Sequence, residues 1–227
     1  MRITALEPQQ RQADRYNLHL DGRFALALDA ELVVAEGLSV GVELTEADVE
    51  RLRTREDERR LLDAALHFLG PRPRSRAEVR RRLLTPKRNR PAPDPDAVER
   101  TLDRLERLGV LNDEDFAEFW VENRERFSPR AARALTQELR QRGVSRETVE
   151  RVTDPERDEE RAIAAGRQRL RALAGLNYAT FRTQLGQFLL RRGFSYADAR
   201  TAVQRLWEET CGTAADAEDE AMADDEE

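Results

Sequence analysis

From about residue 56 to about residue 206, apolar residues recur at intervals of three and four positions. This spacing is typical of helices that bury one face, so the pattern predicts a mainly α-helical protein. The expected core residues, segment by segment, are Leu61, Leu62, Ala65, Leu66 and Leu69; Val98, Leu102, Leu105 and Leu108; Phe116, Phe119, Trp120 and Phe127; Ala132, Leu135 and Leu139; Ile163, Leu170 and Leu173; Phe181, Leu185 and Phe188; and Ala199, Val203 and Leu206.

The composition limits how these helices can pack. Hydrophobic residues make up 39% of the 227 residues and charged residues 37%, against roughly 45–50% and about 25% in average domains. Such a chain has too few apolar side chains for one thick core. Thin two-layer packing, in which every helix keeps one face in water, suits this composition better.

Local signals mark where the helices start and stop. The predicted starts are Ser75 with Glu78, Ser128 before Pro129, and Ser195 with Asp198. A serine with an acid three residues later can form a capping box, and proline is favoured at the first helical position. The predicted ends are Gly70, Gly109, Gly143 and Gly193. The prolines between Thr85 and Pro95 predict a loop, because proline breaks a helix interior.

The first 55 residues have a different pattern. Apolar and polar residues alternate over residues 16–20 and 24–28, with Asp21-Gly22 between them, which predicts a β-hairpin with a two-residue turn. Residues 3–7 are expected to add a third strand. A short helix is expected over residues 29–35, ending at Gly37. Thr45 with Asp48 can cap a further helix that carries Val49 and Leu52.

The helical signals repeat at a distance of about fifty residues. Leu139, Arg142, Gly143, Val144 and Ser145 match Leu189, Arg192, Gly193, Phe194 and Ser195. A period near fifty with three helices per period predicts tandem three-helix repeats, and repeats that contact only their neighbours form an elongated array. The expected division is residues 1–55 for the N-terminal element, then 56–111, 112–153 and 154–208 for three repeats, then 209–227 for a tail.

Charge is distributed unevenly along the chain. The net charge is −6, but residues 211–227 hold eight acids and no base, so the remainder carries 39 basic and 37 acidic side chains. We expect this acidic tail to be disordered. Residues 70–92 hold nine bases and one acid, Glu78, and Lys87 is the only lysine of the chain. A GC-rich genome would also favour arginine, so the local cluster is the better evidence for an anionic partner.

The sequence offers little for catalysis or metal binding. His19 and His67 have no second histidine or cysteine at metal-ligand spacing, and Cys211 has no nearby histidine. Asp113 and Asp115 are interpreted as a solvated helix start that suits the helix dipole. No phosphate-binding loop is present. We therefore expect no enzyme activity, no cofactor, no metal and no small-molecule substrate. We also expect neither a signal peptide nor a membrane span, and so a cytoplasmic protein.

Four segments resemble one known family. Residues 37–41 (GLSVG), 74–83 (RSRAEVRRRL), 105–117 (LERLGVLNDEDFA) and 139–144 (LRQRGV) are similar, in this order, to the RecX family, whose members regulate the RecA recombinase. The resemblance covers roughly residues 1–208. The sequence departs from the family pattern in the loop 85–95 and in the acidic tail.

The resemblance implies tandem three-helix repeats behind a short N-terminal element. It also implies binding in the groove of the RecA–DNA filament, which would limit recombinase activity in DNA repair and the SOS response. DNA contact would be weak and made through the filament, with single-stranded DNA as one candidate, and the family has no catalytic residues to carry over. The residues expected to contact partner or DNA are Arg72, Arg74, Arg76, Arg80, Arg81, Arg82, Lys87, Arg88, Arg140, Arg142, Arg191 and Arg192.

Other functions stay open at this point. Residues 61–111 could form a winged-helix module of a sequence-specific transcription regulator, with residues 75–84 as recognition helix and 98–108 as its support. A third helix rather than a paired β-wing is expected after Leu111, which argues against that alternative. A helical scaffold with unknown partners is a further possibility.

Overall fold

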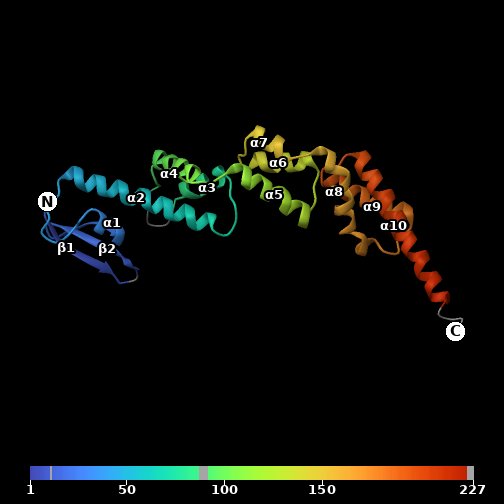
Figure 1. The fold of residues 1–227 in the computed structure, drawn as a ribbon, viewed down its shortest axis with the longest axis horizontal. Coiled ribbons are helices and arrows are strands. Elements are labelled where there is room, and N and C mark those ends of the chain that lie inside the picture. The colour runs from blue at the N-terminus through green and yellow to red at the C-terminus, as the bar shows by residue number, and fades with distance from the viewer. Residues whose placement is uncertain (11, 87–91, 224–227) are drawn as a thin grey trace. The chain divides into compact units, whose positions relative to one another are not determined.

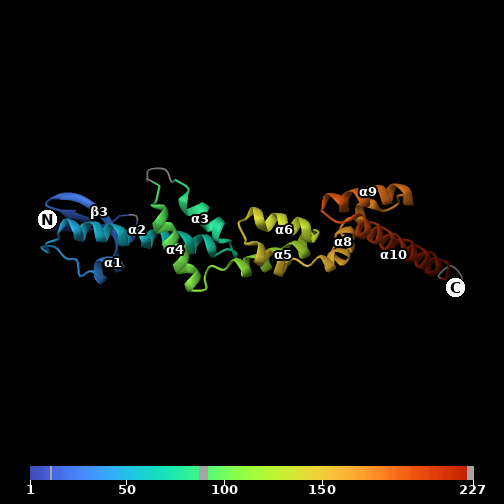
Figure 2. The ribbon, with the colours of Figure 1, turned by 90° about the horizontal axis from the view of Figure 1, so that it is seen from above.

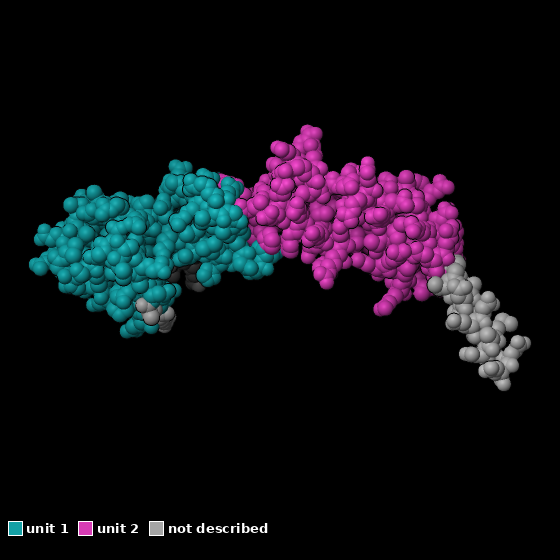
Figure 3. All heavy atoms as spheres, in the orientation of Figure 1, with its two compact units in different colours: residues 1–72, 79–110 teal, residues 73–78, 111–227 magenta. Residues whose placement is uncertain are grey.

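A computed structural model describes residues 1–10, 12–86 and 92–223, with the side chains of all these residues except Ala13 and 211–223. The chain divides into two compact units, coloured separately in Figure 3: residues 1–72 with 79–110, and residues 73–78 with 111–227. The predicted fold class is confirmed, because helices dominate and the β-strands lie at the N-terminus.

The first unit begins with a three-stranded antiparallel sheet in the order β1-β2-β3. Its strands are β1 (Ile3–Gln9), β2 (Gln12–Leu20) and β3 (Arg23–Asp29). Asp21 and Gly22 join β2 to β3 with φ angles of 47° and 82°, which is the positive φ that a tight hairpin turn requires. The predicted hairpin and the predicted third strand are both confirmed.

Two helices follow the sheet. Helix α1 (Ala30–Ala35) is capped by the Asp29 carboxylate, which accepts a hydrogen bond from the backbone N–H of Glu31. Helix α2 (Glu46–Leu69) starts at the predicted capping box of Thr45 and Asp48. The predicted division at residue 55 lies inside α2, because no glycine or proline interrupts this helix.

Helix α2 connects the sheet to the rest of the first unit (Figures 1 and 2). It packs against β3 and against α4 (Pro95–Arg107). Near β3, Glu56 is 3% exposed and pairs with Arg15 at 2.6 Å. Burial raises the pKa of Glu56, and the ion pair with Arg15 opposes that rise.

Helix α3 (Arg76–Leu84) precedes the predicted proline-rich loop. The described chain leaves α3 after Leu84 and enters α4 at Pro95, with Asp94 as its cap. Residues 87–91 lie outside the described residues. The boundary between the two units falls within α3, since residues 76–78 belong to the second unit and 79–84 to the first.

The second unit contains two helical groups, each with its own core. Helices α5 (Asp113–Phe127), α6 (Ala132–Gln141) and α7 (Arg146–Val152) enclose Phe116, Leu135 and Leu139. After the 3-10 turn η1 (Pro155–Arg157) come α8 (Asp158–Arg167), the 3-10 turn η2 (Leu170–Leu173), α9 (Tyr178–Arg191) and α10 (Tyr196–Ala223). These enclose Phe181, Leu185 and Phe194.

Most expected core residues are buried or half-buried, but three are not. Leu66, Leu108 and Phe127 are 41%, 62% and 64% exposed, so these assignments are wrong. Leu66 is near the end of α2, Leu108 caps α4, and Phe127 ends α5. At helix ends the neighbouring chain turns away, and the apolar stripe loses its partner there.

Two further expectations need correction. Ser128 does not start a helix: it is the C-cap of α5, and α6 begins at Ala132. The apolar segment of Ile163, Leu170 and Leu173 is not one helix either, because α8 ends at Arg167 and a 3-10 turn follows.

The chain after Leu111 bears on the winged-helix alternative. In the described ranges, strands occur only between Ile3 and Asp29, and α5 follows Leu111. The paired wing of a winged-helix module is therefore missing from the described part of the chain. At the other end, α10 continues to Ala223, into the segment predicted to be a disordered tail. Residues 224–227 and the side chains of 211–223 lie outside the described residues, so the disorder stays a prediction.

Candidate partner-binding surface

Helix α3 carries the centre of the predicted arginine cluster. Ser75 starts the helix, and its hydroxyl accepts a hydrogen bond from the backbone N–H of Glu78 at 3.1 Å. Val79 and Leu83 are buried, which places Arg80, Arg81 and Arg82 on the exposed side of the helix. Only two positions of this nine-residue helix are fully buried, which leaves room for three consecutive arginines on its exposed side.

These three arginines differ in their contacts within the first unit. Arg80 donates through Nε to the carboxylate of Glu99 on α4. The Arg82 guanidinium lies 5.9 Å from the ring centroid of Phe68, within cation–π distance. Arg81 is exposed and pairs with no carboxylate among the residues that the structure describes. Arg81 therefore has the guanidinium most available to a partner.

The remaining predicted residues of this cluster are less exposed or undescribed. Arg72, Arg74 and Arg76 are half-buried. Lys87 and Arg88 lie outside the described residues.

Arg142 occupies a junction inside the second unit. Its guanidinium stacks 3.7 Å from the ring centroid of Trp120, and Nη1 donates to the carbonyl of Glu138 at 3.1 Å. Its own carbonyl accepts a hydrogen bond of 2.7 Å from the hydroxyl of Ser75. The next residue, Gly143, has a φ of +83° and packs directly against Ala77. Arg142 thus joins the start of α3 to the end of α6.

Arg192 occupies the corresponding position fifty residues later. Its Nη1 donates to the hydroxyl of Ser128 at 2.9 Å and to the carbonyl of Pro129 at 3.1 Å. The backbone N–H of Ala131 donates to the Arg192 carbonyl at 3.3 Å. This contact explains why α6 does not begin at Ser128: the segment before Ala132 extends across the end of α9 instead. Arg192 therefore joins the start of α6 to the end of α9.

Each junction also includes an aspartate from the first residue of another helix, Asp113 of α5 or Asp158 of α8. The backbone N–H of Arg76 donates to Asp113 at 2.7 Å, and that of Ala132 donates to Asp158 at 2.8 Å. The interpretation of Asp113 as a merely solvated helix start is therefore wrong. The same set of contacts thus occurs twice within the second unit, at positions fifty residues apart, which indicates that Arg142 and Arg192 have equivalent structural roles there.

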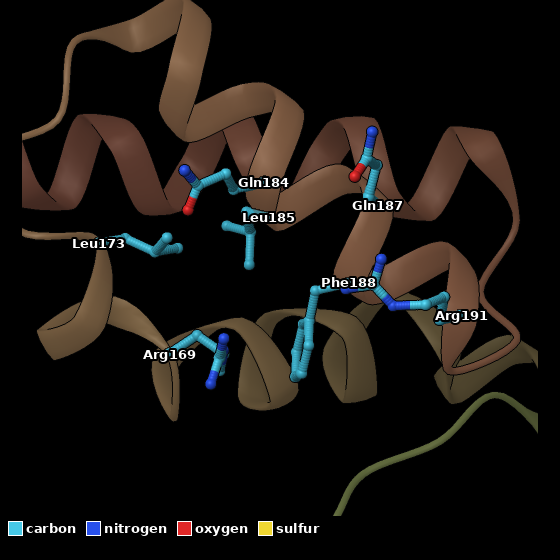
Figure 4. Close-up of a pocket in the computed structure, with 7 residues that line it drawn as sticks. All are labelled: Arg169, Leu173, Gln184, Leu185, Gln187, Phe188 and Arg191. Carbon is cyan, nitrogen blue, oxygen red and sulfur yellow. The ribbon is translucent and has the colours of Figure 1, made fainter.

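Arg140 and Arg191 are exposed in the last turns of α6 and α9. Arg191 lines a hollow of about 140 Å³ together with Arg169, Gln184 and Phe188 (Figure 4). Arg169 was not among the predicted site residues, although Arg167, Arg169 and Arg171 form a short basic run in the sequence. Only the fold brings it beside Arg191.

Arg192 is surrounded by further arginines. Burial lowers the pKa of Arg192, and the nearby charges of Arg130, Arg169 and Arg124 lower it further. Arg130 and Arg124 both pair with Glu138, at 3.1 and 2.9 Å. The second unit therefore gathers positive charge around the end of α9.

Neither a metal-binding cluster nor a membrane-spanning helix occurs among the described residues. No group of three or more His, Cys, Asp or Glu side chains within them is placed to hold a metal ion. Among the same residues, no helix combines the length and apolar character needed to cross a bilayer.

Three parts of the chain match the domain models of one known family. Residues 1–45 match the regulatory protein RecX N-terminal domain, residues 112–152 the second three-helix domain of RecX, and residues 156–203 its third three-helix domain. The chain belongs to the RecX family. The second and third predicted repeats therefore overlap with known family domains. The bounds given above for the three repeats, 56–111, 112–153 and 154–208, stay predictions.

Named relatives and solved structures agree with this assignment. The regulatory protein RecX of Listeria monocytogenes (EGD-e) is 28% identical over 205 residues, which covers 89% of this chain and 74% of that protein. The RecX protein of Halalkalibacterium halodurans is 30% identical over 152 residues, 65% of this chain and 55% of that one. A crystal structure of regulatory protein RecX has a TM-score of 0.61 at 21% identity and covers 88% of this chain and 97% of its own. RecX from Lactobacillus salivarius has a TM-score of 0.53 at 23% identity, covering 67% and 97%.

Proposed function

We propose that this protein binds the RecA–DNA filament, in its groove, and limits the activity of the recombinase. Membership of the RecX family supports a regulatory role, since its relatives are named regulatory proteins. One structural observation carries the finer proposal. The helices α3, α6 and α9 each carry an exposed arginine in the last turn, namely Arg81, Arg140 and Arg191. Arginine thus recurs on the exposed surface of successive helical groups.

The chemistry of a filament groove fits such a surface. The groove presents phosphates of DNA and carboxylates of protein, and the planar guanidinium forms paired hydrogen bonds with both. A protein built from repeats can contact several filament subunits at once, and each added contact then forms at high effective concentration. The chain outside residues 211–227 has a net charge of only +2, which favours weak DNA contact through the filament over strong binding to bare duplex. The proposed place of action is the cytoplasm, in DNA repair and the SOS response.

The arginines of α3 also have a plainer explanation. Cations in the last turn stabilise a helix by interacting with its dipole, by about 0.3–1 kcal/mol each. A useful test must therefore separate the loss of a partner contact from the loss of helix stability. Arg80 is unsuited to charge reversal alone because it pairs with Glu99. Substitutions at Arg81 and Arg82 leave the ion pair of Arg80 with Glu99 intact.

The test measures ATP hydrolysis by RecA on single-stranded DNA at increasing concentrations of this protein. We expect the unmodified protein to depress hydrolysis. The double variant Arg81→Glu, Arg82→Glu should need at least a tenfold higher concentration for the same effect, equivalent to about 1.4 kcal/mol of binding free energy.

The matched control is Arg104→Glu, Arg107→Glu, which reverses two exposed arginines in the last turn of α4 in the same unit. It loses the same dipole interactions and should shift inhibition less than twofold. Circular dichroism checks that both variants stay helical. The proposal fails if the unmodified protein leaves ATP hydrolysis unchanged. The assignment of α3 fails if the two double variants lose inhibition equally.

A further inference from the structure

The hollow beside α9 has the composition of an anion site. Gln184, Phe188 and Arg191 line it from one face of α9, since they are spaced by three and four residues. Arg169 lines it from the segment before η2, and the buried Leu185 closes it from the core side. In Figure 4 the ring of Phe188 lies between the side chains of Arg169 and Arg191.

The positive charges around this hollow lack a carboxylate. The guanidinium groups of Arg169 and Arg192 lie 5.1 and 4.5 Å from the ring centroid of Phe188. Within the described part of the chain, no carboxylate oxygen lies within ion-pair distance of Arg169, Arg191 or Arg192. Arg130, which pairs with Glu138 through Nη1, leaves its buried Nε without a hydrogen-bond partner. Two of these guanidinium groups, those of Arg169 and Arg192, therefore lie against an aromatic face instead of a carboxylate.

The preceding helical group offers an internal comparison. Leu139 and Leu189 correspond at an offset of fifty, so Glu138 on α6 corresponds to Phe188 on α9. Glu138 accepts hydrogen bonds from Arg124 at 2.9 Å and from the indole N–H of Trp120 at 2.8 Å. Where the earlier group has a carboxylate that neutralises its arginines, the later group has a phenyl ring. The later group therefore lacks the internal carboxylate that the earlier group has at the corresponding position.

We propose that the hollow between η2 and α9 binds one backbone phosphate of a single-stranded nucleic acid. The two non-bridging oxygens of a phosphodiester can accept from Arg169 and Arg191, and charge-assisted bonds of this kind are strong. The side-chain amides of Gln184 and Gln187, which also line the hollow, add two further donors. The two ester oxygens continue into solvent on the open side.

The shape of the hollow favours a single strand over a duplex. A volume of about 140 Å³ is enough to hold a four-oxygen phosphate group. A flexible single strand can bend one phosphate into a concavity, whereas a duplex presents its phosphates on a rigid convex surface. This inference gives the proposed function a contact with DNA, and its test omits the recombinase so that the two can fail separately.

The test measures binding of a fluorescein-labelled 20-mer of deoxythymidine by anisotropy, over a range of salt concentrations. The variant is Arg169→Gln, Arg191→Gln in the full chain. The matched control is Arg182→Gln, Arg200→Gln, which removes two exposed arginines of the same helical group away from the hollow. Each phosphate contact to a single strand contributes about 0.7 to the slope of log affinity against log salt.

We expect the hollow variant to bind about tenfold more weakly at 50 mM salt, with a slope smaller by about 0.7, and the control to lose less than twofold. Phe188→Glu, which copies the arrangement of Glu138, should weaken binding as much while leaving the circular dichroism unchanged. Equal losses in variant and control, or no binding of the 20-mer by the unmodified protein, would overturn the proposal.

Two further arms identify the source of the anion. A decamer of glutamate that displaces the oligonucleotide at equal charge concentration would assign the hollow to protein carboxylates and overturn the proposal. Inorganic phosphate at 20 mM is the second probe. If it raises the melting temperature of the unmodified protein but not of the Arg169→Gln, Arg191→Gln variant, while both bind the 20-mer equally, the hollow binds free phosphate and the strand contact is wrong.

Discussion

The joint between the start of α3 and the end of α6 can be tested by one methyl group. At Gly143 the φ angle is +83°, and a Cβ added there would lie closer to the Ala77 Cβ than 3.0 Å, a separation that real Cβ atoms essentially never show. Gly143→Ala therefore adds two costs to the free energy of folding. The left-handed backbone costs an alanine about 1–2 kcal/mol, and forcing a methyl group into a packed contact costs about 1–3 kcal/mol more.

Gly175 provides a control with the same backbone conformation in the same unit. Its φ angle is +74°, and an added Cβ would meet nothing within 4 Å. Gly175→Ala should thus lose only the backbone contribution of about 1–2 kcal/mol. The difference between the two variants isolates the contact of Gly143 with Ala77.

Urea unfolding followed by tryptophan fluorescence measures both variants. The two tryptophans of the chain, Trp120 and Trp207, both lie in the second unit, so the signal reports the unit that contains both glycines. We expect Gly143→Ala to lower the free energy of unfolding by about 2–5 kcal/mol. Ala77→Gly in the same chain should recover about 1–3 kcal/mol, because it removes the overlapping methyl group.

The reasoning would be refuted by equal losses in Gly143→Ala and Gly175→Ala. It would also be refuted if Gly143→Ala cost the same free energy of unfolding with and without Ala77→Gly. The two substitutions would then be additive, and the contact would contribute nothing.

Two further predictions concern the start of α2 and the acidic tail. Hydrogen bonds from the Thr45 hydroxyl and backbone N–H, with an ion pair to Arg51, lower the pKa of Asp48 from 3.8 to about 2; this cap stabilises α2 above pH 3.8 and is lost as the pH falls toward 2. Thr45→Ala should raise that pKa toward 3.8, which an NMR titration of the Asp48 carboxyl measures, and an unchanged pKa would contradict the role of the hydroxyl. Truncation after Thr210 should tighten DNA or filament binding at low salt and matter little at high salt, because a tethered polyanion competes over a Debye length of about 10 Å at 0.1 M. Superimposed salt titrations of the full and truncated chains would mean that the tail only keeps the protein soluble.

The features that could be predicted from the sequence are those that depend on neighbours in the chain. The capping boxes at Thr45 and Ser195, and the positive φ of Asp21 and Gly22, need only residues within four positions, and all three occur as predicted. Similarly, three-and-four spacing identified the buried faces because helix periodicity is local. The exceptions are at helix ends, as with Leu108, where the extent of the neighbouring helix decides exposure.

What could not be predicted depends on contacts across long stretches of sequence. The hydroxyl of Ser75 meets the carbonyl of Arg142 at a separation of 67 residues, and no local signal distinguishes that serine from any other cap. Ser128 has the same local appearance, yet its hydroxyl accepts from Arg192 and the helix starts later. The recurrence of Arg-Gly at a fifty-residue offset predicts tandem repeats, but nothing local shows which contacts the two arginines make. In the structure both residues lie where the end of one helix meets a segment that precedes another, at Ser75 and at Ser128.

The joints and the charged surface place opposing demands on the same residue type. Arg142 stacks on Trp120 and donates to the carbonyl of Glu138, so its guanidinium is engaged within the second unit. Glu138 pairs with Arg124 and Arg130, so these two arginines are neutralised within their own group. The later group keeps Arg192 in the joint but carries Phe188 in place of the carboxylate, and Arg169 and Arg191 stay unneutralised beside it. One exchange at one position of the repeat therefore replaces an internal carboxylate by an aromatic ring, and it leaves Arg169 and Arg191 for the proposed phosphate.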